Sequence, residues 1–144
     1  MAYWLVKSEP VKYSWDHMVE DGVTFWNGVR NHQASNNLKA MRLGDRAFFY
    51  HSNEGLAIVG IVEIVREYYP DPSDDTARFG MVDVRALEAM PAPVTLKMIK
   101  SHPALSEMAL VRQSRLSVSP VNEHQWLEIC RLGGLTTAAE PGPG

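Results

Sequence analysis

The stretch that decides the fold is RAFFYHSNEGLAIVGIVEIV, residues 46–65. The segments 46–52 and 56–65 are rich in aromatic and β-branched residues, which favour strands. The connection Asn53-Glu54-Gly55 ends on a glycine and predicts a hairpin turn between them. Gly60, inside the second segment, indicates a bulge or the close approach of another part of the chain. The stretch therefore predicts an antiparallel β-hairpin.

Further strands and short helices are predicted on both sides of this hairpin. The expected strands are residues 2–8, 23–26, 81–86 and 115–119. The expected helices run from a Ser14 cap to Glu20, from Arg30 or Asn31 to Leu43-Gly44, and from an Asn122 cap to Gly133, with shorter helical turns at 95–100 and 104–110. Residues 69–80 are expected to form an exposed loop. Because such short helices lack the long crossovers of a doubly wound parallel sheet, we expect an α+β fold. Its sheet is predicted to be a small, strongly curved mixed sheet or β-barrel of about five or six strands, with short helices at its periphery.

The composition indicates one domain. The chain has 144 residues, of which 45% are hydrophobic, and this is enough to close a core without a metal or a disulfide. We expect a single domain over residues 1–135, followed at 136–144 by a disordered tail of small residues, proline and glycine. The single Cys130 and the lack of an apolar run after a basic start predict an intracellular, cytoplasmic protein.

The net charge limits the kinds of partner. It is −3, which argues against an affinity built mainly on the neutralisation of phosphates, since that needs a pronounced basic footprint. One local basic groove is still compatible with this average. If the protein binds nucleic acid, we expect it to read a base.

The run WNGVRNHQASNN, residues 26–37, is the first candidate site. It packs an aromatic ring, a guanidinium and several amides closely enough to stack on and hydrogen-bond a planar ligand. Asn and Gln are only moderate helix formers and Gly is a poor one, so folding alone gives little reason to gather them here. Gly28 permits a close turn, and Arg30 and Asn37 flank an apolar helical stripe. The alternative is a buried Trp26 and a solvated helix face.

Two predicted strand exits carry further polar groups. Ser8 and Glu9 can present hydrogen-bond acceptors where Pro10 fixes the turn after the first strand. His51 and Ser52 end the first strand of the hairpin. Their imidazole and hydroxyl could form hydrogen bonds to a ligand at the mouth of a barrel; the alternative is a histidine whose hydrogen bond goes to a loop carbonyl.

Motifs of catalysis and metal binding are missing from the sequence. The five histidines are scattered, and none forms a short-spacing metal motif with Cys130. We expect no metal, no cofactor and no catalytic residue. The enzyme alternative would use Glu9 and His51 as acid and base, which requires both to converge in one pocket. A third alternative is a protein-interaction module in which Trp26 and Arg30 form a hot spot on a flat exposed patch.

Four separated motifs occur in a characteristic order. They are YWLVKSEP at 3–10, WNGVRN at 26–31, GD at 44–45 followed by FYHS at 49–52, and LVRQSRLSV at 110–118. In these motifs the chain resembles the EVE domain family over residues 3–135. The resemblance implies a PUA-like curved β-barrel, related to the YTH readers of methylated RNA, with a pocket for a modified nucleobase and no catalytic apparatus.

The resemblance also implies which residues form the pocket. These are Ser8, Glu9, Pro10, Trp26, Gly28, Arg30, Asn31, Asn36, His51 and Ser52. The family pattern favours Asn36, whereas the helical periodicity favours Asn37. His32 and Ser35 stand where the family usually has Tyr and Arg, so we expect base recognition more than contact with the nucleic-acid backbone. The expected function is a binding module for a modified nucleobase in DNA or RNA, with no membrane partner; the sequence does not identify an effector protein that would act after binding.

Overall fold

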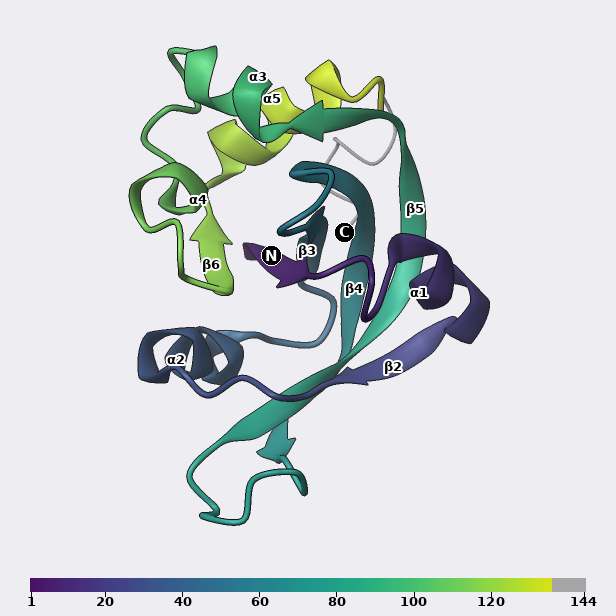
Figure 1. Cartoon of the computed structure of the whole chain (residues 1–144), viewed down its shortest axis with the longest axis vertical. Helices are drawn as coiled ribbons and strands as arrows, with labels where there is room; N and C mark the ends of the chain where they lie inside the picture. Colours follow the sequence, from purple (N-terminus) through teal and green to yellow (C-terminus); the bar gives the residue numbers. More distant parts are fainter. Residues whose placement is uncertain (136–144) are drawn as a thin grey trace.

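Six strands form one mixed sheet in the order β2-β5-β4-β3-β1-β6 in the computed structural model, which describes residues 1–135 (Figure 1). The strands are β1 (Tyr3–Ser8), β2 (Val23–Trp26), β3 (Arg46–His51), β4 (Ala57–Pro70), β5 (Gly80–Thr95) and β6 (Val118–Val121). The helices are α1 (Trp15–Asp21), α2 (His32–Ala40), α3 (Leu96–Ser101), α4 (Ala109–Arg112) and α5 (Glu123–Leu132). The tail expected at 136–144 lies outside the described residues.

The pairing of the strands confirms the expected fold class. β1 and β3 run parallel, whereas the other neighbouring strands are antiparallel, including the predicted hairpin of β3 and β4. Within residues 1–135, β2 and β6 remain at the two edges and do not pair with each other. The sheet is therefore curved and mixed, with short helices around it, but it is not closed into a barrel.

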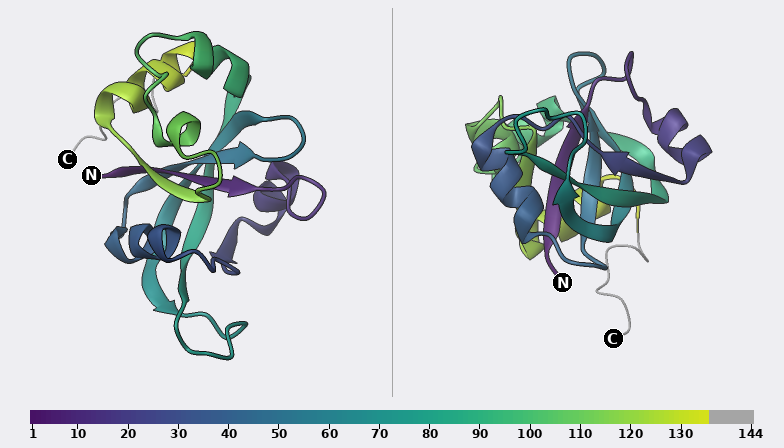
Figure 2. Two further views of the ribbon diagram at one scale, coloured as in Figure 1. Left: turned by 60° about the vertical axis from the view of Figure 1, so that its left-hand side comes forward. Right: turned by 90° about the horizontal axis from the view of Figure 1, so that it is seen from below.

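Both faces of the sheet are buried. Successive side chains of a strand point to opposite faces, so Phe48 joins one hydrophobic cluster and Phe49 the other. In the first cluster, the ring of Trp126 from α5 stacks on Tyr3 and Phe48, with centroids 4.4 and 3.9 Å away. Figure 2 shows β1 between α2 on one side and the chain of α4 and α5 on the other. The two clusters fix β1 and β3 at the centre of the molecule.

Gly60 marks a close approach of α1 to the sheet, as its place in the hairpin predicts. A Cβ atom at this position would lie 2.5 Å from the indole ring of Trp15. The register between β3 and β4 also shifts beside Gly60. The glycine therefore lets Trp15 lie directly on β4, which holds α1 close to the end of β3.

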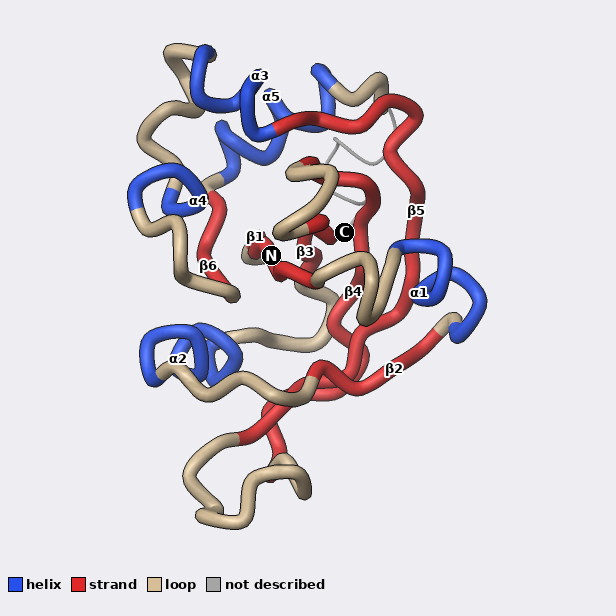
Figure 3. The backbone as a smooth tube through the Cα atoms, viewed as in Figure 1, coloured by secondary structure: helices blue, strands red, loops and turns tan. Residues whose placement is uncertain are grey.

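The prediction of a short strand at 81–86 is wrong, since β5 extends to Thr95 (Figure 3). Its register with β4 moves from Ala89 opposite Gly60 to Val94 opposite Ile58. Residues 90–93 thus face a single residue of β4, and this bulge contains two prolines, which have no N–H for a ladder. Because side chains do not alternate regularly through the bulge, the sequence pattern did not indicate that the strand continues beyond residue 86.

Three other boundaries differ from the prediction. α2 begins at its Asn31 cap but ends at Ala40, because the backbone of Met41 is extended (φ −68°, ψ 143°). Gly44 instead forms the turn before β3, with φ +87°. The last strand, predicted at 115–119, is β6 at Val118–Val121, and the helix expected at 104–110 is reduced to turns followed by α4. The Ser14 and Asn122 caps are confirmed, each as part of a capping box.

Candidate functional site

A cleft of about 560 Å³ opens between the end of β1 and the strand β2. We call it the aromatic cleft. It is lined by residues of the β1 exit and its turn and by residues of α1 and β2, namely Lys7, Ser8, Glu9, Lys12, Tyr13, Asp21, Thr24, Phe25, Trp26 and Asn27. Its volume falls in the range of small-molecule sites, roughly 300–1,000 Å³. The cleft therefore has room for a planar ligand.

Aromatic rings form much of its wall. Trp26 is only 8% exposed and belongs to the core, where its ring meets Phe49 at 5.5 Å and Tyr13 at 6.4 Å in edge-to-face geometry. Phe25 beside it is 54% exposed. The wall thus combines a tryptophan held rigidly by its neighbours with a phenylalanine that is free to cover a ligand. The core interpretation of Trp26 is thus confirmed, and its place in the cleft wall keeps the ligand interpretation as a prediction.

The polar groups of the cleft centre on Tyr13 and Asp21. The phenol of Tyr13 donates a hydrogen bond to Oδ2 of Asp21 at 2.7 Å. Burial and this hydrogen bond raise the pKa of Tyr13 to about 12, so the phenol stays a neutral donor at neutral pH. It orients the carboxylate, which has further acceptor capacity. Asp21 is thus a fixed acceptor on the cleft wall.

The two predicted strand exits lie side by side. Ser8 pairs with His51 in the β1–β3 register, and the N–H of Ser52 donates to the carbonyl of Ser8 at 2.9 Å. The carboxylate of Glu9 accepts from the amide of Asn53 and pairs with Lys12 at 3.1 Å. These contacts fasten the turn after β1 to the β3–β4 hairpin. Ser8 and Glu9 line the aromatic cleft, whereas Pro10 does not.

His51 holds α1 in place. Its Nε2 accepts the N–H of Trp15 at 3.0 Å, so a backbone donor satisfies the ring rather than the loop carbonyl considered above. Burial lowers its pKa, partly offset by Asp16. Glu9 lines the aromatic cleft, and His51 does not. The pair therefore does not meet the requirement of the acid–base alternative.

The turn after Trp26 is anchored by Asp71, a residue that the sequence analysis did not single out. Gly28 has φ +79°, and its N–H donates to Asp71 at 2.8 Å. Arg30 donates to the same oxygen at 3.1 Å and to Ser73 at 3.0 Å. Burial alone would raise the pKa of Asp71, but hydrogen bonds from Ser73, Gly28 and Arg30 outweigh it and lower the pKa to about 2. Gly28 and Arg30 thus position the cleft wall from outside the cleft.

The amides of α2 have separate tasks. Asn31 caps the helix, accepting the N–H of Ala34 at 2.9 Å. Asn37 donates to the carbonyl of Val118 at 2.7 Å, as the periodicity favoured, whereas Asn36 is exposed. Ser35 is buried, and His32 lies 5.1 Å from Phe79. None of these residues lines the aromatic cleft.

Sequence reasoning missed Tyr13, Asp21 and Phe25. Tyr13 lies in the turn after β1. Asp21 is the last residue of α1, and polar residues are common at helix ends, so its position did not indicate a site. Phe25 carried the one available signal, an exposed aromatic residue in a short strand beside Trp26.

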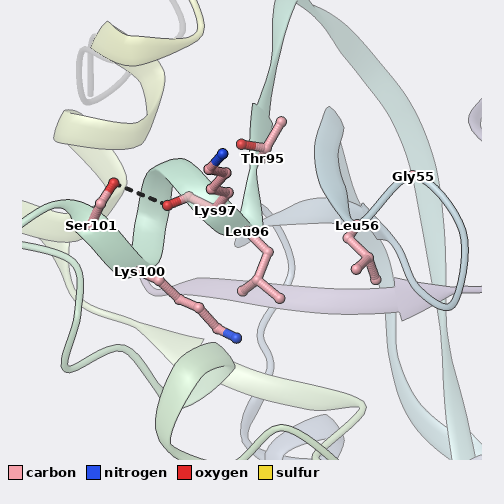
Figure 4. A pocket seen from close by; sticks show the side chains of 7 residues that line it. All are labelled: Gly55, Leu56, Thr95, Leu96, Lys97, Lys100 and Ser101. Carbon is pink, nitrogen blue, oxygen red and sulfur yellow. Dashed lines mark hydrogen bonds between the residues drawn. The ribbon is translucent and has the colours of Figure 1, made fainter.

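Two further clefts continue from the aromatic cleft. The middle cleft, about 610 Å³, shares Lys7 and Glu9 with it and includes Tyr50, Ser52 and Arg115. The lysine cleft, about 580 Å³, shares Leu56 and Leu96 with the middle cleft and includes Lys97 and Lys100. Figure 4 shows Leu56 on the hairpin side and Leu96, Lys97 and Lys100 on α3.

A curved mixed sheet with an aromatic cleft at its strand ends defines a ligand-binding domain of the PUA-like class. The chain belongs to the EVE domain family, which matches residues 2–132.

The chain is similar to named proteins and to solved structures. Thymocyte nuclear protein 1 of Homo sapiens is 36% identical, over 87% of this chain and 71% of that protein, and the Gallus gallus protein is 37% identical, over 87% and 66%. The crystal structure of protein Atu2648 from Agrobacterium tumefaciens has a TM-score of 0.91 at 50% identity, covering 98% of this chain and 97% of that one. The structure of human THYN1 protein in complex with 5-methylcytosine containing DNA has a TM-score of 0.87 at 33% identity, covering 94% and 99%.

A more distant structure shares the fold alone. It is the YTH domain of Zygosaccharomyces rouxii MRB1 protein in complex with N6-methyladenosine RNA, with a TM-score of 0.59 and 17% identity over 92% of this chain and 86% of that one. The expected relationship to YTH domains is thus confirmed at the level of fold. No helix among residues 1–135 is long and apolar enough to span a membrane.

Proposed function

We propose that this protein recognises a modified nucleobase in nucleic acid, bound in the aromatic cleft. The observation that carries the proposal is the combination of an aromatic wall, Phe25 and Trp26, with a carboxylate that Tyr13 orients. A nucleobase is a planar ring with hydrogen-bonding groups at its edge, and this combination matches both features. Ser8 and Glu9 supply the rim.

The energies favour an unpaired base. Stacking of a base on an aromatic side chain contributes on the order of 1–3 kcal/mol, whereas extruding a base from a duplex costs a few kcal/mol. A methyl group buried against an apolar wall adds ~0.8 kcal/mol. Carboxylates accept hydrogen bonds from the amino group of cytosine. The cleft therefore suits a methylated base that carries an amino group.

The human relative supports a specific first ligand, because its structure contains 5-methylcytosine DNA. 5-Methylcytosine carries both the methyl group and the amino donor that the cleft accommodates. We therefore take single-stranded DNA with one 5-methylcytosine as the primary probe. The RNA of the YTH complex makes N6-methyladenosine RNA the second probe.

We further propose that the protein binds its ligand without converting it. Glu9 is engaged by Asn53 and Lys12, and Nε2 of His51 by the N–H of Trp15. A general acid and a general base must both reach one reacting position. These two side chains are committed to different structural contacts, which supports binding over turnover.

The test is a fluorescence anisotropy titration of labelled oligonucleotides that differ only in one base: 5-methylcytosine, cytosine, N6-methyladenine or adenine, in DNA and in RNA. We expect the protein to prefer a modified base and the Phe25→Ala variant to lose most of that preference. Val23→Ala is the matched control, since Val23 is an exposed apolar residue of the same strand that does not line the cleft. Equal affinity for every oligonucleotide in the panel overturns the proposal.

A further inference from the structure

Three clefts of the protein follow one another through shared lining residues. The aromatic and middle clefts share Lys7 and Glu9, and the middle and lysine clefts share Leu56 and Leu96. Shared walls mean that a ligand that fills one cleft can continue into the next. The base proposed for the aromatic cleft belongs to a chain of nucleotides, whose neighbours must lie somewhere on this surface.

The middle and lysine clefts carry a net positive charge, whereas the protein as a whole is negative. The net charge of the chain is −3, yet the middle and lysine clefts contain four cationic side chains, Lys7, Arg115, Lys97 and Lys100. Their single carboxylate, Glu9, is already paired with Lys12. The two clefts therefore form a local cationic surface on an acidic protein.

Most cations of the protein are already engaged. Of its 14 Lys and Arg residues, the side chains of only four have no ion pair, hydrogen bond or ring contact among residues 1–135: Arg78, Lys97, Lys100 and Arg115. Three of these four line the two clefts. Lys7 adds a cation whose amino group donates to the carbonyl of Ser114 at 2.8 Å and lies over the ring of Tyr50, 5.9 Å from its centroid, without a carboxylate partner. Unpaired charges gather where an anionic ligand would supply their partners.

We propose that a single nucleic-acid strand runs from the aromatic cleft through the middle cleft to the lysine cleft, with its phosphates paired to Lys7, Arg115, Lys97 and Lys100. Leu56 and Leu96, at the junction of the last two clefts, provide apolar contacts for a sugar or a base (Figure 4). This inference rests on the proposed function, because it takes its starting point from the base in the aromatic cleft. It adds the path of the strand and a sequence-independent part of the affinity.

The test is the salt dependence of binding. Each phosphate contact to a single strand contributes a slope of about −0.7 to the logarithm of affinity against the logarithm of salt concentration. We compare wild type, Arg115→Ala and the double variant Lys97→Ala/Lys100→Ala on short single-stranded DNA with one 5-methylcytosine. Each lost contact is expected to make the slope shallower by about 0.7. If a variant and wild type bind equally at ~1 M salt, the variant should therefore bind about fivefold more weakly than wild type at ~0.1 M salt.

Two controls separate the strand path from base recognition. Arg78→Ala removes the fourth unpaired cation, which lies in the loop at the opposite end of the molecule from α3, and is expected to leave the slope unchanged (Figure 1). Binding of free 5-methyl-2′-deoxycytidine, followed by NMR, is expected to be equal in all variants. If the Arg115 and Lys97/Lys100 variants keep the wild-type slope, the proposed strand path is wrong. If wild type binds modified and unmodified bases equally, the proposed function is wrong instead.

Discussion

The guanidinium of Arg30 lies 3.1 Å from the carboxylate of Asp71, and the side chain of Asp71 is completely buried. The same carboxylate accepts the N–H of Gly28. The loop between β4 and β5 is thereby tied to the turn that follows Trp26. This contact fixes the wall of the aromatic cleft from a part of the chain far away in sequence.

Removing Asp71 tests this anchor. Asp71→Ala leaves the N–H of Gly28 and the guanidinium of Arg30 without their acceptor, and the lowering of the Asp71 pKa from 3.8 to about 2 corresponds to a contribution of about 2 kcal/mol. We expect the free energy of unfolding in urea at pH 7 to fall by about this amount. Asp75→Ala is the control, because Asp75 is an exposed carboxylate of the same loop. Equal stability of the two variants would contradict the anchoring role.

Acid should remove the Asp71 contribution in a defined range. Because the folded-state pKa is lowered, the stabilisation is present above the ordinary pKa of 3.8 and is lost as the pH falls from there toward about 2. The difference in stability between wild type and Asp71→Ala should therefore shrink in that range. Chemical denaturation at a series of acidic pH values measures it, and a constant difference would show that the carboxylate charge is irrelevant.

His51 gives a second pH dependence with its own range. Burial lowers its pKa below the usual 6.5, so protonation opposes the folded state. As the pH falls from 6.5 toward the lowered pKa, the unfolded chain binds the proton first and wild type should lose stability. His51→Gln retains an acceptor for the N–H of Trp15 but does not titrate. The difference between the two stability curves should change below pH 6.5, and curves that stay parallel would contradict this reading.

Local patterns predicted the local elements of the fold. The hairpin of β3 and β4, the caps at Ser14 and Asn122 and the buried face of α5 follow from a few neighbouring residues, and all are present. β5 was predicted too short, since its two prolines lie in a bulge that only the pairing with β4 reveals. Regular alternation cannot show where a strand continues through an irregular register.

The candidate site depended on contacts between distant segments, and this limited its prediction. The exits at Ser8 and His51 lie side by side, as the family resemblance implied, whereas the residues alone indicated the two strand ends but not their pairing. The partner of Arg30 was not predicted, because nothing in its neighbourhood indicates a carboxylate 41 residues away, and the predicted ligand role of Arg30 stays a prediction. Tyr13 and Asp21 were also missed, because their hydrogen bond joins the two ends of a helix and no local pattern indicates it.

Gly60→Ala should disturb the packing of α1, through Trp15, against β4. The added Cβ would lie 2.5 Å from the Trp15 ring, and overpacking of this kind costs about 1–3 kcal/mol. The double variant Gly60→Ala/Trp15→Phe offers a smaller ring to the new methyl group. In a double-mutant cycle measured by urea denaturation, we expect the second change to recover part of the loss caused by the first. Strict additivity would mean that Gly60 acts through backbone freedom instead.

Asp21 should decide which base edge is preferred. In Asp21→Asn, the carboxylate that accepts from an amino group becomes an amide that both donates and accepts. We expect the preference for 5-methylcytosine over thymine to fall, with a loss of discrimination of about 1–3 kcal/mol, or roughly 5- to 150-fold. Glu20→Gln is the control, since Glu20 is an exposed carboxylate of the same helix outside the cleft. A ratio of affinities unchanged from wild type would remove Asp21 from the recognition site.

The central claim is that the base binds in the aromatic cleft, and NMR mapping with 5-methyl-2′-deoxycytidine tests it most directly. The nucleoside has no strand and no phosphate, so it reports on base recognition alone. The largest shift changes are predicted for the indole N–H of Trp26 and the backbone N–H groups of Asp21, Thr24 and Phe25, which surround the cleft. Shifts confined to α2 around Asn36, with Trp26 and Asp21 unchanged, would contradict the account.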